Sequence, residues 1–98
     1  MNNNTINTLS GAVTLPVFDL LHDRMNLREI RRFYRSLCDL QGSDHANTAV
    51  TIIDILIRLA GIELPDVYAE VMASPKLQAI FLDEFLADFD DILSEYEA

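Results

Sequence analysis

The sequence is short of cysteine, histidine and glycine, and each shortage argues against a class of functional site. A single cysteine, Cys38, cannot form a disulfide within the chain, so we expect a reducing compartment. Cys38, His22 and His45 do not have the spacing of zinc ligands. The three glycines stand far apart, so no phosphate-binding loop is predicted.

The acidic segments do not replace these missing sites. Residues 88–91 have the acid density of a calcium loop but no glycine for its turn. No pair of carboxylates is marked out as a general acid and base. We therefore predict that the protein is not an enzyme and uses neither a metal nor a cofactor.

Basic residues and long apolar runs are scarce as well. Seven Lys and Arg against 16 Asp and Glu give a net charge of −9, which disfavours direct binding to nucleic acid or to an anionic membrane. The densest apolar run, residues 49–57, is broken by Asp54, so no membrane span is expected. Residues 1–18 lack the basic start of a secretory signal. These features predict a cytoplasmic protein, in its own cell or in an infected host.

What is present is a helical pattern. Half of the residues are hydrophobic, which is typical of a globular chain. We predict an all-α fold, a compact bundle of about five helices over residues 14–98, forming a single domain. Residues 1–13 are polar and aperiodic, and we expect a flexible N-terminal arm there, with a short strand at 12–15 left open. Pro16 suits the first turn of the first helix.

Capping signals mark the next helices. Asn26 and Glu29 have the spacing of a capping box, and Gly42 suits the C-terminal end of that helix. Pro65 opens a short helix, and Ser74-Pro75 opens the last one.

The segment between Gly42 and Gly61 is ambiguous, because it is rich in β-branched residues that favour a strand. Its polar residues step by four, three and four, which places them on one helical face. They are Asn47, Thr51, Asp54 and Arg58. We predict a helix that is apolar nearly all round and forms the buried centre.

Large aromatic side chains recur along the last helix at steps of four and seven. They are Phe81, Phe85, Phe89 and Tyr96. This stripe either forms the core or lies in the groove of a partner protein. The burial of Phe89 and Tyr96 distinguishes the two.

Charge is segregated along the chain. Up to Arg58 there are six acids and six bases, whereas the remainder has ten acids and only Lys76. The acids of the last helix that we expect to bind a partner are Asp83, Glu84, Asp88, Asp90, Asp91 and Glu95. Like charges at these spacings and acids in the last turn both destabilise a helix, so the pattern indicates a function. The alternative is a solvated face that maintains solubility.

Arginines form the basic counterpart of these acids. Four of them share one face of the second helix, namely Arg28, Arg31, Arg32 and Arg35. Arginine suits bidentate pairing with carboxylates. The arginines of this ion-pairing stripe have three alternative contacts. They can pair with acids of the same chain, pair with acids of a second copy, or face solvent or a separate partner.

These observations favour a non-catalytic inhibitor or modulator, whose acidic last helix docks on the basic, nucleic-acid-binding surface of another protein. Small acidic antagonists of nucleases and transcription proteins, such as those that phages encode, resemble the chain in size and charge. The main alternative is an assembly chaperone or structural subunit that acts through apolar helix faces and as a homodimer or larger oligomer. A regulator of transcription that acts through protein contact is a third hypothesis.

Overall fold

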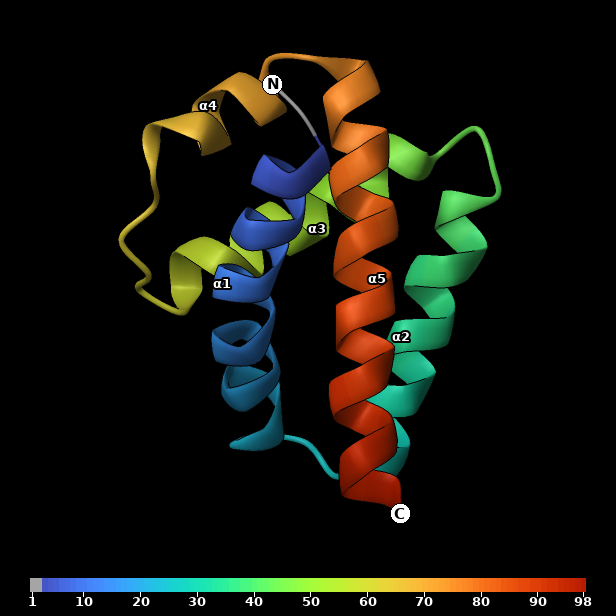
Figure 1. The fold of residues 1–98 in the computed structure, drawn as a ribbon. Coiled ribbons are helices and arrows are strands. Elements are labelled where there is room, and N and C mark those ends of the chain that lie inside the picture. The colour runs from blue at the N-terminus through green and yellow to red at the C-terminus, as the bar shows by residue number, and fades with distance from the viewer. Residues whose placement is uncertain (1–2) are drawn as a thin grey trace.

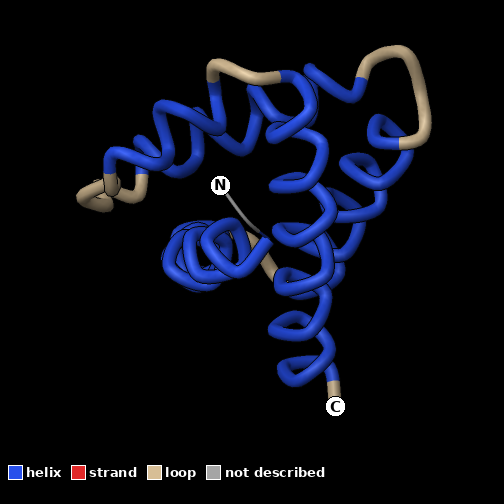
Figure 2. Tube along the Cα trace, turned by 45° about the horizontal axis from the view of Figure 1, so that its top comes forward, coloured by secondary structure: helices blue, strands red, loops and turns tan. Residues whose placement is uncertain are grey.

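The computed structural model describes residues 3–98 as five α-helices joined by short loops, without a strand in this part of the chain (Figure 2). The helices are α1 (Asn3–His22), α2 (Leu27–Gln41), α3 (Ala46–Leu59), α4 (Asp66–Met72) and α5 (Pro75–Glu97). The prediction of an all-α bundle of about five helices is confirmed.

Helix α5 is the axis of the bundle. It contacts each of the other four helices and lies between α1 and α2 (Figure 1). Helices α1 and α5 start at the same end of the bundle (Figure 1), but they cross at an angle, since Figure 2 shows α1 nearly end-on and α5 lengthwise. Helix α2 runs in the opposite direction to α5 (Figure 1). The acid-rich helix therefore has two neighbours along its length, one on each side.

The aromatic stripe of α5 forms the core. Phe81, Phe85 and Phe89 are fully buried. The Phe89 ring lies 5.8 Å from that of Phe85 and 5.5 Å from that of Phe18 on α1, distances typical of favourable aromatic pairs. Tyr96, near the C-terminal end, is 46% exposed. The prediction that the stripe forms the core is confirmed for the three phenylalanines, so these side chains do not lie in the groove of a partner protein.

The N-terminal region differs from the prediction. From Asn3 onward, the expected arm of residues 1–13 is the first half of α1, and the strand left open at 12–15 is helical too. Ile6, Leu9 and Val13 are buried at helical spacing, and they continue the core stripe toward Val17. Intervening Asn and Thr residues hid this periodicity. Residues 1–2 lie outside the described residues.

Pro16 lies inside α1 rather than in its first turn. A proline there has no N–H to donate to the carbonyl of Ala12, which costs helix stability. Val13 and Val17 on either side are fully buried, so tertiary packing offsets that cost.

The helix boundaries agree with the capping signals. Asn26 and Glu29 form a complete capping box at the start of α2, and Gly42 follows its last residue. The Ser74 side chain accepts a hydrogen bond from the Leu77 backbone at the start of α5. Because these signals are local, the sequence alone was enough to predict them.

Helix α3 is confirmed as a helix, but it is not the buried centre. Its inner face is buried, whereas Ile55 and Leu59 on its outer face are 51% and 67% exposed. Helix α5 occupies the centre instead, which leaves one apolar side of α3 uncovered. Within residues 3–98, no helix is both long enough and apolar enough to span a bilayer.

Candidate protein-binding surface

Helix α5 presents its acids in two rows that flank the buried stripe. The α2-side row, at steps of seven residues, consists of Asp83, Asp90 and Glu97. The α1-side row, at steps of four, three and four, consists of Glu84, Asp88, Asp91 and Glu95. The six predicted residues are therefore divided between two sides of one helix, with Asp83 and Asp90 on the side that faces α2.

Arg31 of α2 neutralises most of the α2-side row. Its guanidinium donates hydrogen bonds to Asp90, at 2.7 Å, and to Glu97. A weaker contact reaches Ser94 at 3.4 Å, and the guanidinium carbon lies 5.3 Å from the centre of the Tyr34 ring. One arginine thus ties the C-terminal half of α5 to α2.

This cluster changes the proton affinities of its members. The hydrogen bonds that Arg31 donates to Glu97 and, to a lesser degree, to Asp90 raise the pKa of Arg31 further above its ordinary value. The hydrogen bond from Arg31 holds the pKa of Glu97 below its ordinary value. Burial raises the pKa of the neighbouring Tyr34 to about 12. The cluster also places a cation beside the C-terminal end of α5, where the helix has no basic residue of its own.

The other three arginines of the predicted stripe make no ion pair with any residue in 3–98. Arg28, Arg32 and Arg35 are all exposed on α2. Arg35 acts on Glu97 only as a nearby charge that contributes to lowering its pKa. Of the four arginines of the stripe, Arg31 is therefore the one that pairs with acids of the same chain among residues 3–98.

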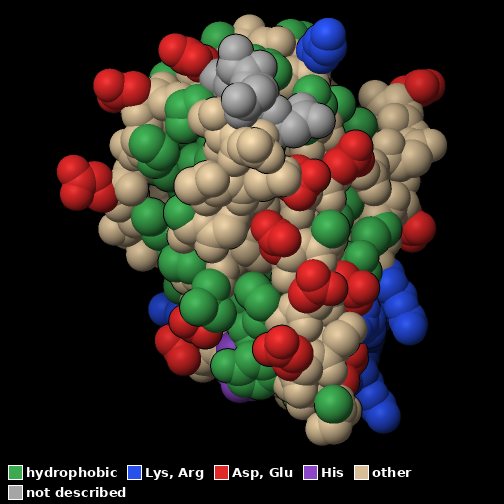
Figure 3. All heavy atoms as spheres, viewed as in Figure 1, with side chains coloured by type: hydrophobic (Ala, Val, Ile, Leu, Met, Phe, Trp, Pro, Cys, Tyr) green, Lys and Arg blue, Asp and Glu red, His purple; other side chains and the backbone are tan. Residues whose placement is uncertain are grey.

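Three acids of the α1-side row, Asp88, Asp91 and Glu95, have no such basic counterpart in residues 3–98. Glu84 and Asp88 are half-buried, whereas Asp91 and Glu95 are exposed. No Lys or Arg among the described residues forms an ion pair with Asp88, Asp91 or Glu95. Figure 3 shows acidic side chains along the face formed by α1 and α5, with the basic side chains at the edges of this view.

Asp88 is held by a neutral donor. The hydroxyl of Ser10, fully buried on α1, donates a hydrogen bond of 2.7 Å to its carboxylate. The buried Thr14 hydroxyl in turn donates to the Ser10 carbonyl at 2.6 Å. Both hydroxyls are thus satisfied within the α1–α5 interface, and the negative charge of Asp88 remains uncompensated.

A second polar cluster joins α3 to α4. Arg58 donates to Asp54, one helical turn earlier on α3, at 3.1 Å. The Tyr68 hydroxyl donates to the other carboxylate oxygen of Asp54 at 2.5 Å. Burial, together with this bond, raises the pKa of Tyr68 above its ordinary range. Because its charge is neutralised, Asp54 contributes little to an acidic surface.

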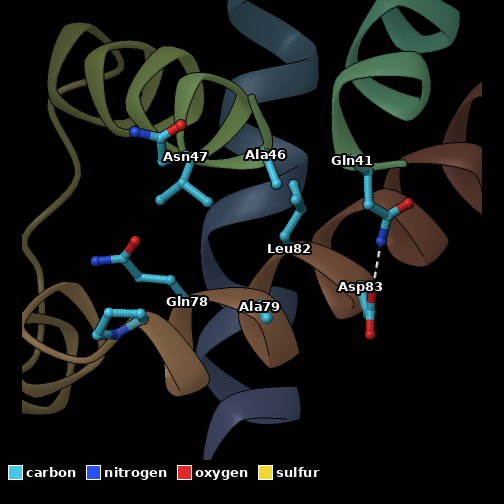
Figure 4. Close-up of a pocket in the computed structure, with 9 residues that line it drawn as sticks. Gln41, Ala46, Asn47, Gln78, Ala79, Leu82 and Asp83 are labelled. Carbon is cyan, nitrogen blue, oxygen red and sulfur yellow. Dashed lines mark hydrogen bonds between the residues drawn. The ribbon is translucent and has the colours of Figure 1, made fainter. Parts of the chain in front are cut away.

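A hollow of about 310 Å³ lies where the end of α2, the start of α3 and the start of α5 meet (Figure 4). Asp83 stands at one end of it and accepts a hydrogen bond from the amide of Gln41. Asn47 and Gln78 lie toward the other end. Asp83, like Asp88, therefore meets a neutral donor and keeps its charge.

Three contributors to these sites were missed at the level of sequence. Glu97 could have been found, because it continues the seven-residue spacing of Asp83 and Asp90. Ser10 and Gln41 could not, because their roles depend on how α1 and α2 pack against α5. Within residues 3–98 no group of three or more His, Cys, Asp or Glu side chains is placed to hold a metal ion.

Comparison with known proteins gives no further guide to this surface. No protein-family model matches the chain, and neither a curated protein nor a solved structure shows significant similarity to it.

Proposed function

We propose that the protein is a non-catalytic inhibitor or modulator that docks the acidic surface of α5 on a basic surface of another protein. Basic surfaces of that extent usually serve to bind nucleic acid. The carboxylates of α5 then occupy positions that phosphates would take. The chain itself, with its net charge of −9, does not bind nucleic acid.

The observation that carries the proposal is the separation of charge on the folded surface. Asp88, Asp91 and Glu95 have no paired cation in residues 3–98, although three exposed arginines are available on α2. If charges were arranged in the fold only so that they neutralise one another, the three arginines would lie beside the three carboxylates. Their separation leaves one face able to attract a basic partner.

The geometry of α5 supports this role. The helix has 23 residues, which gives a rod about 34 Å long. Its α1-side row presents one carboxylate per ~5.5 Å of helix rise. One strand of duplex DNA presents a phosphate every ~3.4 Å along its axis. The row is sparser than a nucleic acid strand but comparable in scale, and the packed core of the bundle keeps it straight.

The test uses the partner captured from native host lysate with the tagged full chain. Its affinity for wild-type protein is compared with that for Asp91→Lys/Glu95→Lys. These two residues are exposed, so the fold should survive, and an unchanged thermal unfolding curve verifies it. Loss of binding supports the proposal. Full binding by the folded double variant contradicts it.

A matched control separates local from overall charge. Glu63→Lys/Glu70→Lys makes the same change of net charge on the α3–α4 loop and on α4, where both residues are exposed. We expect this variant to bind within about threefold of wild type, since distant surface charges are screened at physiological salt. An equal loss in both double variants would mean that only the total charge matters.

One observation favours a second candidate, an assembly chaperone or structural subunit. The outer apolar side chains of α3, Ile55 and Leu59, are more than half exposed. A hollow of about 230 Å³ beside Leu59, lined also by Leu20 and Leu56, extends this apolar surface to α1. Uncovered apolar side chains at one place are typical of a surface that contacts another protein. Binding that does not respond to salt would favour this function over the first.

A further inference from the structure

The hollow between α2, α3 and α5 combines a buried apolar floor with an uncompensated carboxylate. Val50 and Leu82 are only 6% and 2% exposed, and they form its deep side. Ala46 of α3 and Ala79 of α5 add methyl groups (Figure 4). The small side chains of these two alanines leave the space open.

The rim of the hollow carries polar side chains whose oxygens can accept hydrogen bonds. Within the described part of the chain, the Asp83 carboxylate accepts a side-chain hydrogen bond from the neutral amide of Gln41 and from no cation. Gln78 uses its amide nitrogen to donate to the Met72 carbonyl at 2.6 Å, so its amide oxygen remains available. Asn47 contributes a further amide from α3. No Lys or Arg of the described chain lines the hollow.

An apolar floor with a carboxylate and amide oxygens at the rim fits a long aliphatic side chain that ends in a cation. Lysine and arginine both bury their methylene stems against apolar surface and keep the charged group among polar atoms. Arginine fits better, because its planar guanidinium offers five N–H donors to several acceptors at once. The volume, about 310 Å³, is at the small end of binding pockets and suits one side chain.

We propose that this hollow is an anchor pocket for an arginine side chain of the basic partner. The inference rests on the proposed function, since it takes the partner to be a protein with a basic surface. It adds a division of roles. The exposed carboxylates of the α1-side row accelerate encounter, whereas the arginine in the hollow prolongs the complex, as buried anchor residues do.

The test is an NMR titration of the full chain with a hexa-arginine peptide at low salt. We expect the side-chain amide signals of Asn47 and Gln78 and the methyl signals of Val50 and Leu82 to shift. Ala79→Leu fills the hollow without changing charge, and it should weaken binding about tenfold. Ala87→Leu is the matched control, because Ala87 is also exposed on α5 but lies outside the hollow. It should bind as wild type does.

Other results separate the failure of this inference from that of the proposed function. If the peptide shifts only the signals of Asp91 and Glu95, the hollow is not its site, but an acidic docking surface remains. If it shifts no signal of α5, both proposals fail.

Two further results would identify a different occupant of the hollow. Equal shifts with a neutral hexa-glutamine peptide would show that the hollow does not select a cation. Shifts that appear on concentrating the protein alone would identify a second copy as the occupant. Either of these last two results overturns the anchor pocket.

Discussion

Ser10 on α1 donates a hydrogen bond of 2.7 Å from its Oγ to Oδ2 of Asp88 on α5. The two residues are 78 positions apart in the sequence, and Ser10 is completely buried. Asp88 therefore belongs both to the acidic surface and to the interface between the two helices. Reversal of its charge would disturb the fold as well as binding, so Asp91 and Glu95 are the better probes of docking.

Removal of the Ser10 hydroxyl should destabilise the protein. In Ser10→Ala the carboxylate of Asp88 loses a donor in a partly desolvated place, which costs about 1–3 kcal/mol. Urea unfolding measures the change. Ser36→Ala is the control, because Ser36 is exposed and bonds only within its own helix, so a change within about 0.5 kcal/mol is expected. Equal stability of the two variants would show that the Ser10–Asp88 bond contributes nothing.

The N-terminal half of α1 should contribute to stability as a core element. Leu9 is 2% exposed and Leu15, on the same helix, is 48% exposed. Leu9→Ala should lower the free energy of unfolding by about 2–5 kcal/mol, the range for buried leucines. The identical change at Leu15 should cost under about 1 kcal/mol. Similar small effects at both positions would mean that residues 3–13 do not pack against the core.

The sequence was sufficient to predict those parts of the fold that depend on local chemistry. The capping box of Asn26 and Glu29 and the Ser74-Pro75 start act within a few residues. The first half of α1 was missed because Ser10 and Thr14 occupy buried positions where apolar residues are expected. Their hydroxyls are satisfied only by partners that the tertiary structure provides.

The candidate site was predictable as a pattern but not as a set of contacts. Helical periodicity places the α1-side row on one face without knowledge of the fold. It does not reveal that Arg31, and not Arg28, lies opposite Asp90. The position of α2 along α5 decides this, and it depends on the packing of the whole core.

Arg31 and Asp90 should be energetically coupled. The distance of 2.7 Å between Arg31 Nη1 and Asp90 Oδ1, together with the 19% exposure of the Arg31 side chain, favours a small but measurable contribution of this ion pair to stability. A double-mutant cycle with Arg31→Met and Asp90→Asn should give a coupling of about 0.5–1 kcal/mol. The same cycle with Arg28→Met in place of Arg31→Met should give none, since Arg28 makes no described ion pair. Additive effects for Arg31 and Asp90 would contradict the assignment.

The lowered pKa of Glu97 predicts that the free energy of unfolding depends on pH in the acidic range. Arg31 holds this pKa below the ordinary value of 4.5 in the folded protein, so the unfolded chain binds more protons in the window just below that value. The contribution of the pair is therefore present above that value and is lost as the pH falls through the folded pKa. Arg31→Met should lose less stability on acidification through this window. Unfolding curves at several pH values test this, and parallel profiles for the two proteins would contradict it.

The most direct test of docking through α5 is the salt dependence of partner affinity for wild type and for Asp91→Asn/Glu95→Asn. Electrostatic docking predicts that wild-type affinity falls steeply between low and moderate salt. It also predicts that the neutralised variant binds more weakly at low salt and with a shallower dependence. An affinity that is the same for both proteins, or that does not change with salt, would contradict docking through the acidic surface of α5.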